Sequence, residues 1–350
     1  MLIFLCALFT RYPVILIPGS FRSKLSVTSS RRSNWFCPKI ANDTFVFINP
    51  KYFVPPYLGC FLDWLTIDYN ETTDIMKNRE NVDIFSDDFG GLSSVRGTGP
   101  NLFGPRLQYL ERMVKKFEKH GYTEKLNLFA APYDWRFGAA VPDSYYHQLK
   151  NLVEKAYTLN NNTRVALISH SLGAQIAHIF LTEKTDKEWR QKYINSTTFI
   201  APSWSGSGTS VASLWRIQLP IVTFFKPKTI IEFALTLGTL HIHIPHMLAY
   251  ANTTLFIDTD GKEYKGNELI DLFVKTGKLS ERYRRVGEKN YVFLRRYPVP
   301  PDVDTNILFN SGIQTSIGLD ASRWGGIGAP IKQKGDGLVG SAVIEWVIQN

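Results

Sequence analysis

Several features that define large classes of proteins are missing from this 350-residue chain. No uninterrupted apolar run reaches the ~18 residues that a membrane-spanning helix needs, so we expect no transmembrane helix. The net charge is +9, but no zinc-finger spacing or aromatic RNA-binding motif accompanies it, so we expect no nucleic-acid partner. No repeat period is visible, and a hydrophobic share of 44% argues against gross disorder. These absences leave a folded protein with room for a sizeable core.

Two ligand-binding patterns are present only in part. Residues 258–261 (Asp-Thr-Asp-Gly) start like a calcium loop but lack the remaining ligands, so they indicate a turn. Gly97 and Gly99 fit the start of a dinucleotide-binding loop, but Leu102 stands where the third glycine belongs. The sequence therefore predicts neither a metal site nor a cofactor.

Cysteine is scarce, with three residues in the chain. Cys6 lies in the apolar segment 1–10, a candidate signal peptide that lacks a charged start and a clear cleavage site; a buried strand or a misassigned start is the alternative. Cys37 and Cys60 remain, either as a disulfide formed in an oxidising compartment or as two buried thiols. Asn-x-Ser/Thr sequons favour the secretory route and start at Asn42, Asn70, Asn161, Asn195 and Asn252.

Strand and helix patterns alternate along much of the chain. Strands are expected at 13–17, 127–132, 163–169 and 196–201, and helices at 106–119, 145–159 and from 172 onward. This order predicts an α/β protein with a mainly parallel sheet covered on both faces. We expect a core of residues 11–34, 69–202 and 286–350, with a strand at 290–297 and a helix at 343–348. An aromatic lobe, poor in regular structure, is expected at 35–68, and a cap at 203–285.

The sequence Ser169-His-Ser171-Leu-Gly173 joins the predicted strand to the predicted helix. A nucleophile elbow needs this context, and it needs small residues two before and two after the nucleophile. Ser171 is therefore the candidate nucleophile, and a serine that merely caps an ordinary helix is the alternative. At the start of that helix, backbone N–H groups would favour a developing negative charge.

Two further turns fit the same chemistry. Pro18-Gly19-Ser20 follows the first predicted strand, where a hydrolase of this type supplies one oxyanion N–H; the backbone N–H groups of Ser20 and Leu172 are the candidates. Asp336 lies between two glycines late in the chain, where the acid that orients the catalytic histidine is expected. Taken alone, each of these segments is equally a simple turn.

These motifs, in this order and with similar spacings, resemble those of the lecithin:cholesterol acyltransferase and lysosomal phospholipase A2 family. The most specific is Ala131-Pro-Tyr-Asp-Trp-Arg136, and Ala201-Pro-Ser-Trp204 also matches. The resemblance implies an α/β-hydrolase core, a disulfide-stapled membrane-binding lobe and a cap with a lid. It also implies a Cys37–Cys60 disulfide, a glycosylated Asn70, and Ser171 and Asp336 as nucleophile and acid.

The family's catalytic histidine follows the aspartate by a few tens of residues, and none of the seven histidines here stands in that place. His170 belongs to the elbow, and His178 is expected to pack. His241, His243 and His246 fall in the predicted cap. We therefore expect either an active enzyme whose sequence is incomplete or a catalytically inactive lipid-binding relative.

The activity that the resemblance implies is cleavage of a phospholipid acyl ester, followed by transfer of the acyl group to water or a lipid alcohol. The expected partner is a phospholipid membrane or a lipoprotein surface, and the compartment is lysosomal or extracellular. A general esterase or triglyceride lipase is the third possibility, although it would not explain the segment 131–136. Clusters of basic side chains could attract anionic headgroups or simply form solvated faces.

Overall fold

The computed structural model describes residues 11–32, 34–97, 108–216, 227–326 and 328–350. The candidate signal segment 1–10 lies outside this part of the chain. A five-stranded parallel sheet forms the centre, in the order β12-β9-β8-β1-β7. The strands are β12 (Asp304–Leu308), β9 (Ile194–Ile200), β8 (Val165–His170), β1 (Val14–Ile17) and β7 (Leu128–Ala130). This is the predicted α/β class.

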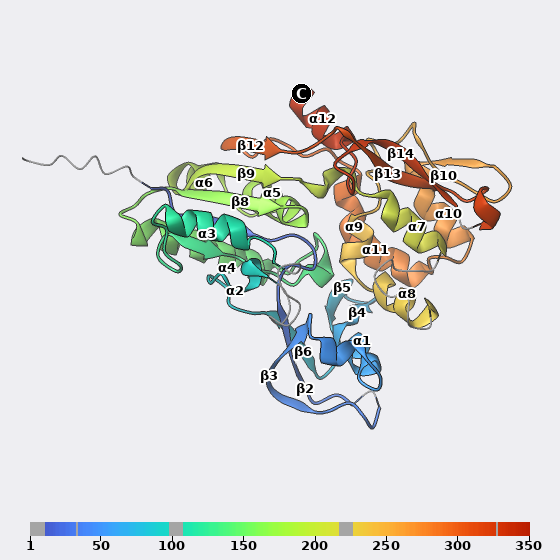
Figure 1. Cartoon of the computed structure of the whole chain (residues 1–350), viewed down its shortest axis with the longest axis horizontal. Helices are drawn as coiled ribbons and strands as arrows, with labels where there is room; N and C mark the ends of the chain where they lie inside the picture. Colours follow the sequence, from blue (N-terminus) through green and yellow to red (C-terminus); the bar gives the residue numbers. More distant parts are fainter. Residues whose placement is uncertain (1–10, 33, 98–107, 217–226, 327) are drawn as a thin grey trace, which may run out of the picture.

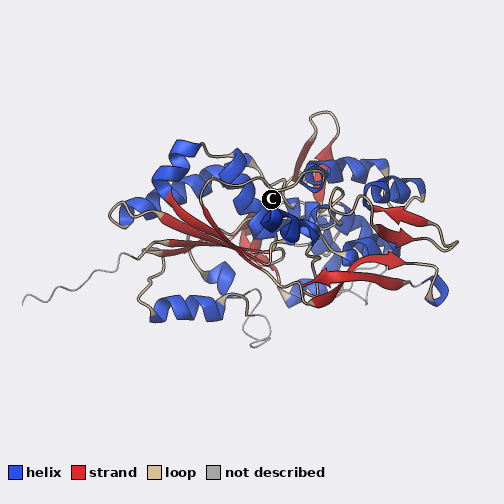
Figure 2. Cartoon of the chain, turned by 90° about the horizontal axis from the view of Figure 1, so that it is seen from above, coloured by secondary structure: helices blue, strands red, loops and turns tan. Residues whose placement is uncertain are grey.

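Helices lie on both faces of the sheet, as Figure 2 shows from above. Along β1 the side chains alternate: Val14 and Leu16 join the core beneath α2 (Ser93–Arg96) and α3 (Glu111–Lys119). Ile15 and Ile17 join the core on the other side. That second face is covered by α4 (Asp143–Leu159), α5 (Leu172–Glu183) and α6 (Lys187–Tyr193). A strand buried on both faces must be apolar throughout, which is why 13–17 reads as a continuous apolar run.

A lobe of antiparallel strands and one helix lies below the sheet in Figure 1. Its sheets have the orders β3-β2-β6 and β4-β5. The elements are β2 (Leu25–Ser29), β3 (Ile40–Phe47), α1 (Leu58–Leu65), β4 (Ile67–Asn70), β5 (Ile75–Asn78) and β6 (Val82–Ser86). Regular structure was not expected at 35–68; β3 and α1 form because Val46, Phe47, Phe61 and Trp64 are buried rather than exposed. The strands β4, β5 and β6 also belong to these lobe sheets, although 69–202 was assigned to the core.

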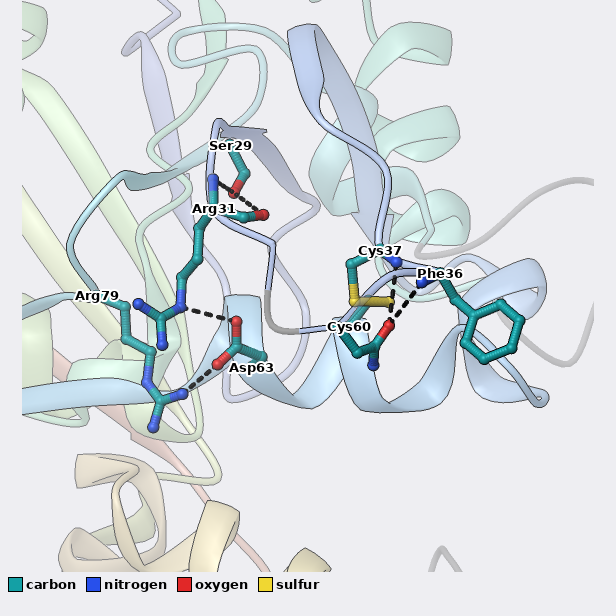
Figure 3. Close-up of a disulfide and its surroundings, with 8 residues drawn as sticks. Ser29, Arg31, Phe36, Cys37, Cys60, Asp63 and Arg79 are labelled. Atoms are coloured by element: carbon teal, nitrogen blue, oxygen red, sulfur yellow. Dashed lines mark hydrogen bonds and ion pairs between the residues drawn. A yellow bond between two sulfur atoms is a disulfide. The ribbon is translucent and has the colours of Figure 1, made fainter.

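Cys37 and Cys60 form a disulfide that joins the start of this lobe to α1 (Figure 3). Beside it, the carboxylate of Asp63 on α1 pairs with the guanidinium groups of Arg31 and Arg79 (Figure 3). Asp63 is 8% exposed, so two cations compensate one nearly buried charge. The disulfide and the ion pairs hold α1 against the segments on either side of it.

The remaining elements form a cap to the right of the sheet in Figure 1. Its helices are α7 (Gly208–Arg216), α8 (Pro227–Leu235), α9 (Gly238–Ile242), α10 (Leu269–Lys275) and α11 (Glu281–Leu294). A mixed sheet of order β11-β10-β13-β14 completes it, with β10 (Thr254–Ile257), β11 (Glu263–Lys265), β13 (Ile313–Asp320) and β14 (Ala329–Gly335). The strands β13 and β14 therefore belong to the cap, although residues 286–350 were expected to be part of the core. The final helix, α12 (Ala342–Gln349), matches the helix predicted at 343–348.

The strand predicted at 290–297 is wrong, because these residues belong to α11 or follow it. Ser280 caps the helix by accepting a hydrogen bond from the Tyr283 N–H. Within the helix, Val286, Asn290 and Leu294 are buried at a spacing of four residues, which gives one inward face. The apolar run at 291–294 resembles a strand only when it is considered apart from the helical turns that precede it. The expected boundary at residue 286 therefore falls inside a helix.

The helix predicted at 106–119 starts at Glu111 instead. Gln108 forms a β-bridge with Gly97, and the N–H groups of Tyr109 and Leu110 donate to the carbonyl groups of Arg96 and Val95. These hydrogen bonds hold Tyr109 in an irregular segment ahead of the helix. Pro105, expected in the first turn, lies outside the described residues.

Among the described helices, none combines the length and the apolar composition that crossing a bilayer requires.

Candidate active site

Ser171 stands between the carboxyl end of β8 and the first residue of α5, and its backbone has φ 55° and ψ −122°. A non-glycine residue seldom adopts a positive φ, and such strain concentrates at functional sites. The Ser171 N–H donates to the carbonyl of Ile200 at 3.0 Å, which fixes the turn against the end of β9. This backbone is that of an elbow rather than of a simple helix cap, for which an extended conformation is usual.

The residues beside the elbow are small because β1 and β9 approach it closely. A methyl group at Gly173 would lie 2.4 Å from the carbonyl oxygen of Pro18 and 2.5 Å from that of Ile17. Ser169, in place of the usual glycine, is 1% exposed and donates its hydroxyl to the Thr198 carbonyl at 3.3 Å. Serine fits this position because it is small and finds a hydrogen-bond partner.

The loop after β1 lies directly against Ser171. A methyl group added at Gly19 would come within 2.9 Å of the Ser171 Cβ, so the neighbouring Ser20 is close to the elbow as well. The Ser20 hydroxyl lies 3.4 Å from His243 Nε2, at the end of α9. Leu172 is the first residue of α5, where helix geometry leaves the backbone N–H without an intrahelical partner.

Tyr109 connects this loop with the elbow. Its hydroxyl oxygen accepts the Gly19 N–H at 3.0 Å and lies 2.6 Å from His170 Nδ1. Because Gly19 supplies a proton to the oxygen, the tyrosine's own proton is free to be donated to Nδ1. The two rings meet edge to face with centroids 5.4 Å apart. Tyr109 therefore connects the Gly19 loop with the residue that precedes Ser171.

Two charges flank His170. Burial lowers the pKa of His170, the positive charge of Arg22 lowers it further, and the negative charge of Asp336 acts in the opposite direction. The imidazole is thus held neutral near pH 7, as the hydrogen bond accepted from Tyr109 requires. Asp336 is close enough to act on His170, although it lies 166 positions later in the chain.

Asp336 forms a tight turn between β14 and α12. Its Oδ1 accepts the N–H groups of Leu338 and Val339, each at 2.8 Å. These two hydrogen bonds fix the direction of the carboxylate. Asp336 can therefore stabilise the turn and also serve as the expected acid, because both turn hydrogen bonds go to Oδ1.

The segment 131–136 anchors the lobe to the sheet. Arg136 is fully buried and donates to the Asp134 carboxylate at 2.5 Å, the Leu65 carbonyl at 3.2 Å and the Asn78 side chain at 2.5 Å. Leu65 ends α1 and Asn78 ends β5, so a single guanidinium joins three elements. A buried cation requires this full set of acceptors. The Trp135 indole N–H likewise donates to the Ser23 carbonyl at 3.3 Å, so both of the last two residues of the motif have fixed partners.

The histidines of the cap and of α5 hydrogen-bond to other groups. His178 Nε2 lies 2.7 Å from the Val299 carbonyl, and His246 Nε2 lies 2.9 Å from that of Arg296. His241 is fully buried between the Tyr291 hydroxyl and the Leu235 carbonyl. Within the described ranges, no hydrogen bond reaches the Ser171 hydroxyl.

Three residues of this region escaped the sequence interpretation. Arg22 was counted only within a basic cluster, Tyr109 lay inside a predicted helix, and His243 carried no motif. Each is brought to the elbow by an irregular segment or by the cap. Such long-range placement leaves no periodic signal in the sequence.

An acyl-hydrolase elbow on a parallel sheet is thus the class that the fold and geometry define, and comparison with known proteins narrows it. The family model for lecithin:cholesterol acyltransferase matches residues 45–216. Lysosomal phospholipase A and acyltransferase of Bos taurus is 25% identical over 317 residues, which cover 89% of this chain and 76% of that protein. Human phosphatidylcholine-sterol acyltransferase is 27% identical over 75% of this chain and 59% of its own length.

A plant relative, lecithin-cholesterol acyltransferase-like 1 of Arabidopsis thaliana, is 32% identical over 56% of this chain and 49% of its own length. The chain thus spans about half to three quarters of these relatives. One solved chain, from the crystal structure of the Tle4-Tli4 complex, matches with a TM-score of 0.45 and 12% identity over 81% of this chain and 71% of its own, a likeness too distant to carry an argument. Over most of its length the chain is thus similar to members of the lecithin:cholesterol acyltransferase and lysosomal phospholipase A family.

Proposed function

We propose that this protein cleaves an acyl ester of a phospholipid through Ser171 and passes the acyl group to water or to a lipid alcohol. One observation carries the proposal: Ser171 has an elbow backbone with the Gly19 loop packed against it. The names of the relatives, which include a phospholipase A and several acyltransferases, supply the substrate class.

In the proposed mechanism the Ser171 hydroxyl attacks the ester carbonyl, and a base takes its proton. The N–H groups of Ser20 and Leu172 hold the oxyanion, one from each side of the nucleophile. The alcohol portion of the lipid leaves, and the acyl group stays on the serine oxygen. Water or a lipid alcohol then attacks this ester and releases Ser171.

Asp336 is the proposed acid that orients the imidazole of the base. Its two backbone hydrogen bonds occupy Oδ1, and Oδ2 remains for an imidazole N–H. The base itself has no assigned residue in the described part of the chain. His170 is unsuited to the role, because its Nδ1 is engaged by Tyr109.

The lobe is the proposed contact with a membrane or lipoprotein surface. Trp35 and Val54 are 81% and 53% exposed, and Phe36 is 43% exposed next to Cys37 (Figure 3). Exposed apolar groups of this size on one lobe favour insertion between lipid headgroups. A disulfide in the same lobe supports an oxidising compartment, and we propose the secretory pathway, lysosomal or extracellular.

Asn70 is the proposed glycosylation site. It ends β4 at the turn into β5, where its Oδ1 accepts the N–H groups of Thr72 and Thr73. Its Nδ2, the atom that a glycan would occupy, stays outside these hydrogen bonds.

The test is product analysis with phosphatidylcholine labelled in one acyl chain, with and without a lipid alcohol. The proposal predicts labelled fatty acid, or an acylated alcohol, from the native protein and neither from Ser171→Ala. Equal release by the two proteins would show that Ser171 is not the nucleophile. Faster cleavage of a triglyceride or a soluble ester than of the phospholipid would favour a general esterase or lipase instead.

A second candidate function is binding of lipid without catalysis. The observation in its favour is the Ser171 hydroxyl, which has no hydrogen bond in the described part of the chain. Binding of the protein to phosphatidylcholine vesicles, with no labelled product after prolonged incubation, would support this candidate over the first.

A further inference from the structure

The loop that carries Ser20 also brings a cation to the nucleophile. Arg22 lies two residues further along, and its N–H donates to the Gly19 carbonyl at 3.2 Å in the same turn. Its guanidinium carbon is 5.1 Å from the centre of the Tyr109 ring, in a cation–π contact. Since Tyr109 contacts both Gly19 and His170, the charge stands beside the elbow.

The position of the Arg22 guanidinium is not explained by an ion pair with a carboxylate. Among the described residues, no aspartate or glutamate lies within ion-pair distance of Arg22, and the undescribed residues include neither residue type. Asp336 acts on His170 and is held by its own turn. Arg22 is half-buried, so its charge is partly removed from water but remains reachable from outside. A partly buried guanidinium with no carboxylate partner favours the binding of an anion.

The chemistry of the substrate supplies such an anion at the right place. In a glycerophospholipid, the phosphodiester is attached to the glycerol carbon next to one that bears an acyl ester. When Ser171 attacks that ester, the phosphate must lie within a few bonds of the elbow. Guanidinium groups match phosphate oxygens in geometry as well as charge.

We propose that Arg22 binds the phosphate of the phospholipid whose acyl ester Ser171 attacks, and so selects phospholipids over neutral esters. The ring of Tyr109 supports the guanidinium by stacking, and the turn after Gly19 fixes its distance from the oxyanion loop. This inference rests on the proposed function, since it names the group that the site recognises.

The test compares Arg22→Gln with the native protein on two lipids that carry identical acyl chains, phosphatidylcholine and diacylglycerol, in the same nonionic detergent micelles. We expect kcat/KM for phosphatidylcholine to fall roughly 10- to 100-fold, the range for one hydrogen bond to a charged group, and that for diacylglycerol to stay unchanged. Arg164→Gln is the control: it removes an equal charge just before β8, at the end of the strand opposite Ser171. An equal loss on both lipids, or no loss, overturns the proposal.

A binding measurement separates this inference from the proposed function. In a Ser171→Ala background, calorimetry with a short-chain phosphatidylcholine should give a dissociation constant at least about 10-fold higher when Arg22→Gln is added. Short-chain diacylglycerol should bind both proteins alike. Millimolar inorganic phosphate should not displace the lipid; displacement that depends on Arg22 would identify a free-phosphate site and contradict the proposal. Native protein that cleaves no ester would refute catalysis, whereas this measurement would still decide the role of Arg22.

Discussion

Gly173 illustrates how a single residue constrains the elbow. In Gly173→Ala the new methyl group would meet two backbone carbonyl oxygens of the segment that ends β1, at 2.4 and 2.5 Å. Backbone cannot rotate away as a side chain can, so we expect a loss of ~1–3 kcal/mol in the free energy of unfolding. Activity should fall by about 10-fold or more, because the oxyanion loop is displaced.

Urea unfolding and esterase assays check this prediction. Gly59→Ala is the control, since the nearest atom to its new methyl group would be Asn34 Nδ2 at 3.5 Å, an ordinary contact. The control should be neutral or slightly stabilising, because alanine favours the helix α1. If Gly173→Ala is as stable and active as Gly59→Ala, the close approach of β1 is not a constraint.

Tyr109 gives a second prediction at the level of one residue. Tyr109→Phe removes the hydroxyl that joins Gly19 to His170 but keeps the ring. The neutral form of His170 loses a donated hydrogen bond, so the pKa of His170 should rise from its lowered position. We expect kcat to fall with little change in KM, because the elbow and oxyanion loop lose their common support.

Nuclear magnetic resonance of the labelled imidazoles can follow this titration. Tyr122→Phe is the matched control, since its hydroxyl donates to the Tyr12 carbonyl at 3.1 Å, away from the elbow. If the pKa of His170 is identical in the native protein and in both variants, the Tyr109 hydroxyl does not influence His170.

Sequence alone was sufficient for residues whose role is local. The strand, turn and helix around Ser171 could be predicted because they and the small neighbours are encoded within a few positions, whereas its role as nucleophile stays a prediction. Arg22, Tyr109 and His243 could not, because their roles arise from contacts across distant segments. His243 reaches Ser20 over 223 positions, and no sequence pattern encodes a contact of that kind.

Among the elements, the lobe has the clearest expected behaviour. Replacing Trp35 and Val54 together by serine removes two of its most exposed apolar side chains and leaves the core intact. We expect binding to phosphatidylcholine vesicles in flotation assays to fall by about 10-fold or more, since burial of a large apolar group contributes ~1.5–3 kcal/mol. Trp324→Ser is the control, because Trp324 is 66% exposed but lies in the cap, between β13 and β14. If the double variant and Trp324→Ser lose vesicle binding equally, the lobe is not the specific membrane contact.

The regularity of the hydrophobic pattern within an element decides whether that element could be predicted from the sequence. The strands β1, β7, β8 and β9 and the helices α4, α5 and α12 match their predicted ranges closely, whereas the fifth strand of the central sheet, β12, was not predicted. In α11 the polar residues Arg284, Arg285, Glu288 and Lys289 precede an apolar run, so the final turn reads as a strand when isolated. Residues 291–294 are helical because they continue the buried face that runs along the whole of α11.

At the scale of the whole molecule, buried histidines make stability depend on pH. Burial lowers the pKa of His241 and of His246 to about 4, whereas the unfolded chain titrates near its ordinary value. The unfolded state therefore takes up protons first as the pH falls below about 6.5, which favours unfolding. We expect the free energy of unfolding to decrease between about pH 6.5 and pH 4, by roughly 3 kcal/mol for each histidine.

Urea unfolding at several pH values measures this dependence. His241→Gln and His246→Gln, each compared with the native protein, should show a shallower decline with falling pH even where their stability at pH 7 is lower. A decline that is identical in the native protein and both variants would show that other groups cause it.

The central claim is that Ser171 carries the acyl group of a phospholipid. Its most direct test is mass spectrometry of the protein quenched in acid during turnover of phosphatidylcholine with one defined acyl chain. We predict a mass increase equal to that acyl group, located on the peptide that contains Ser171 and absent from Ser171→Ala. An acyl group on another residue, or unchanged product release by Ser171→Ala, would contradict the claim.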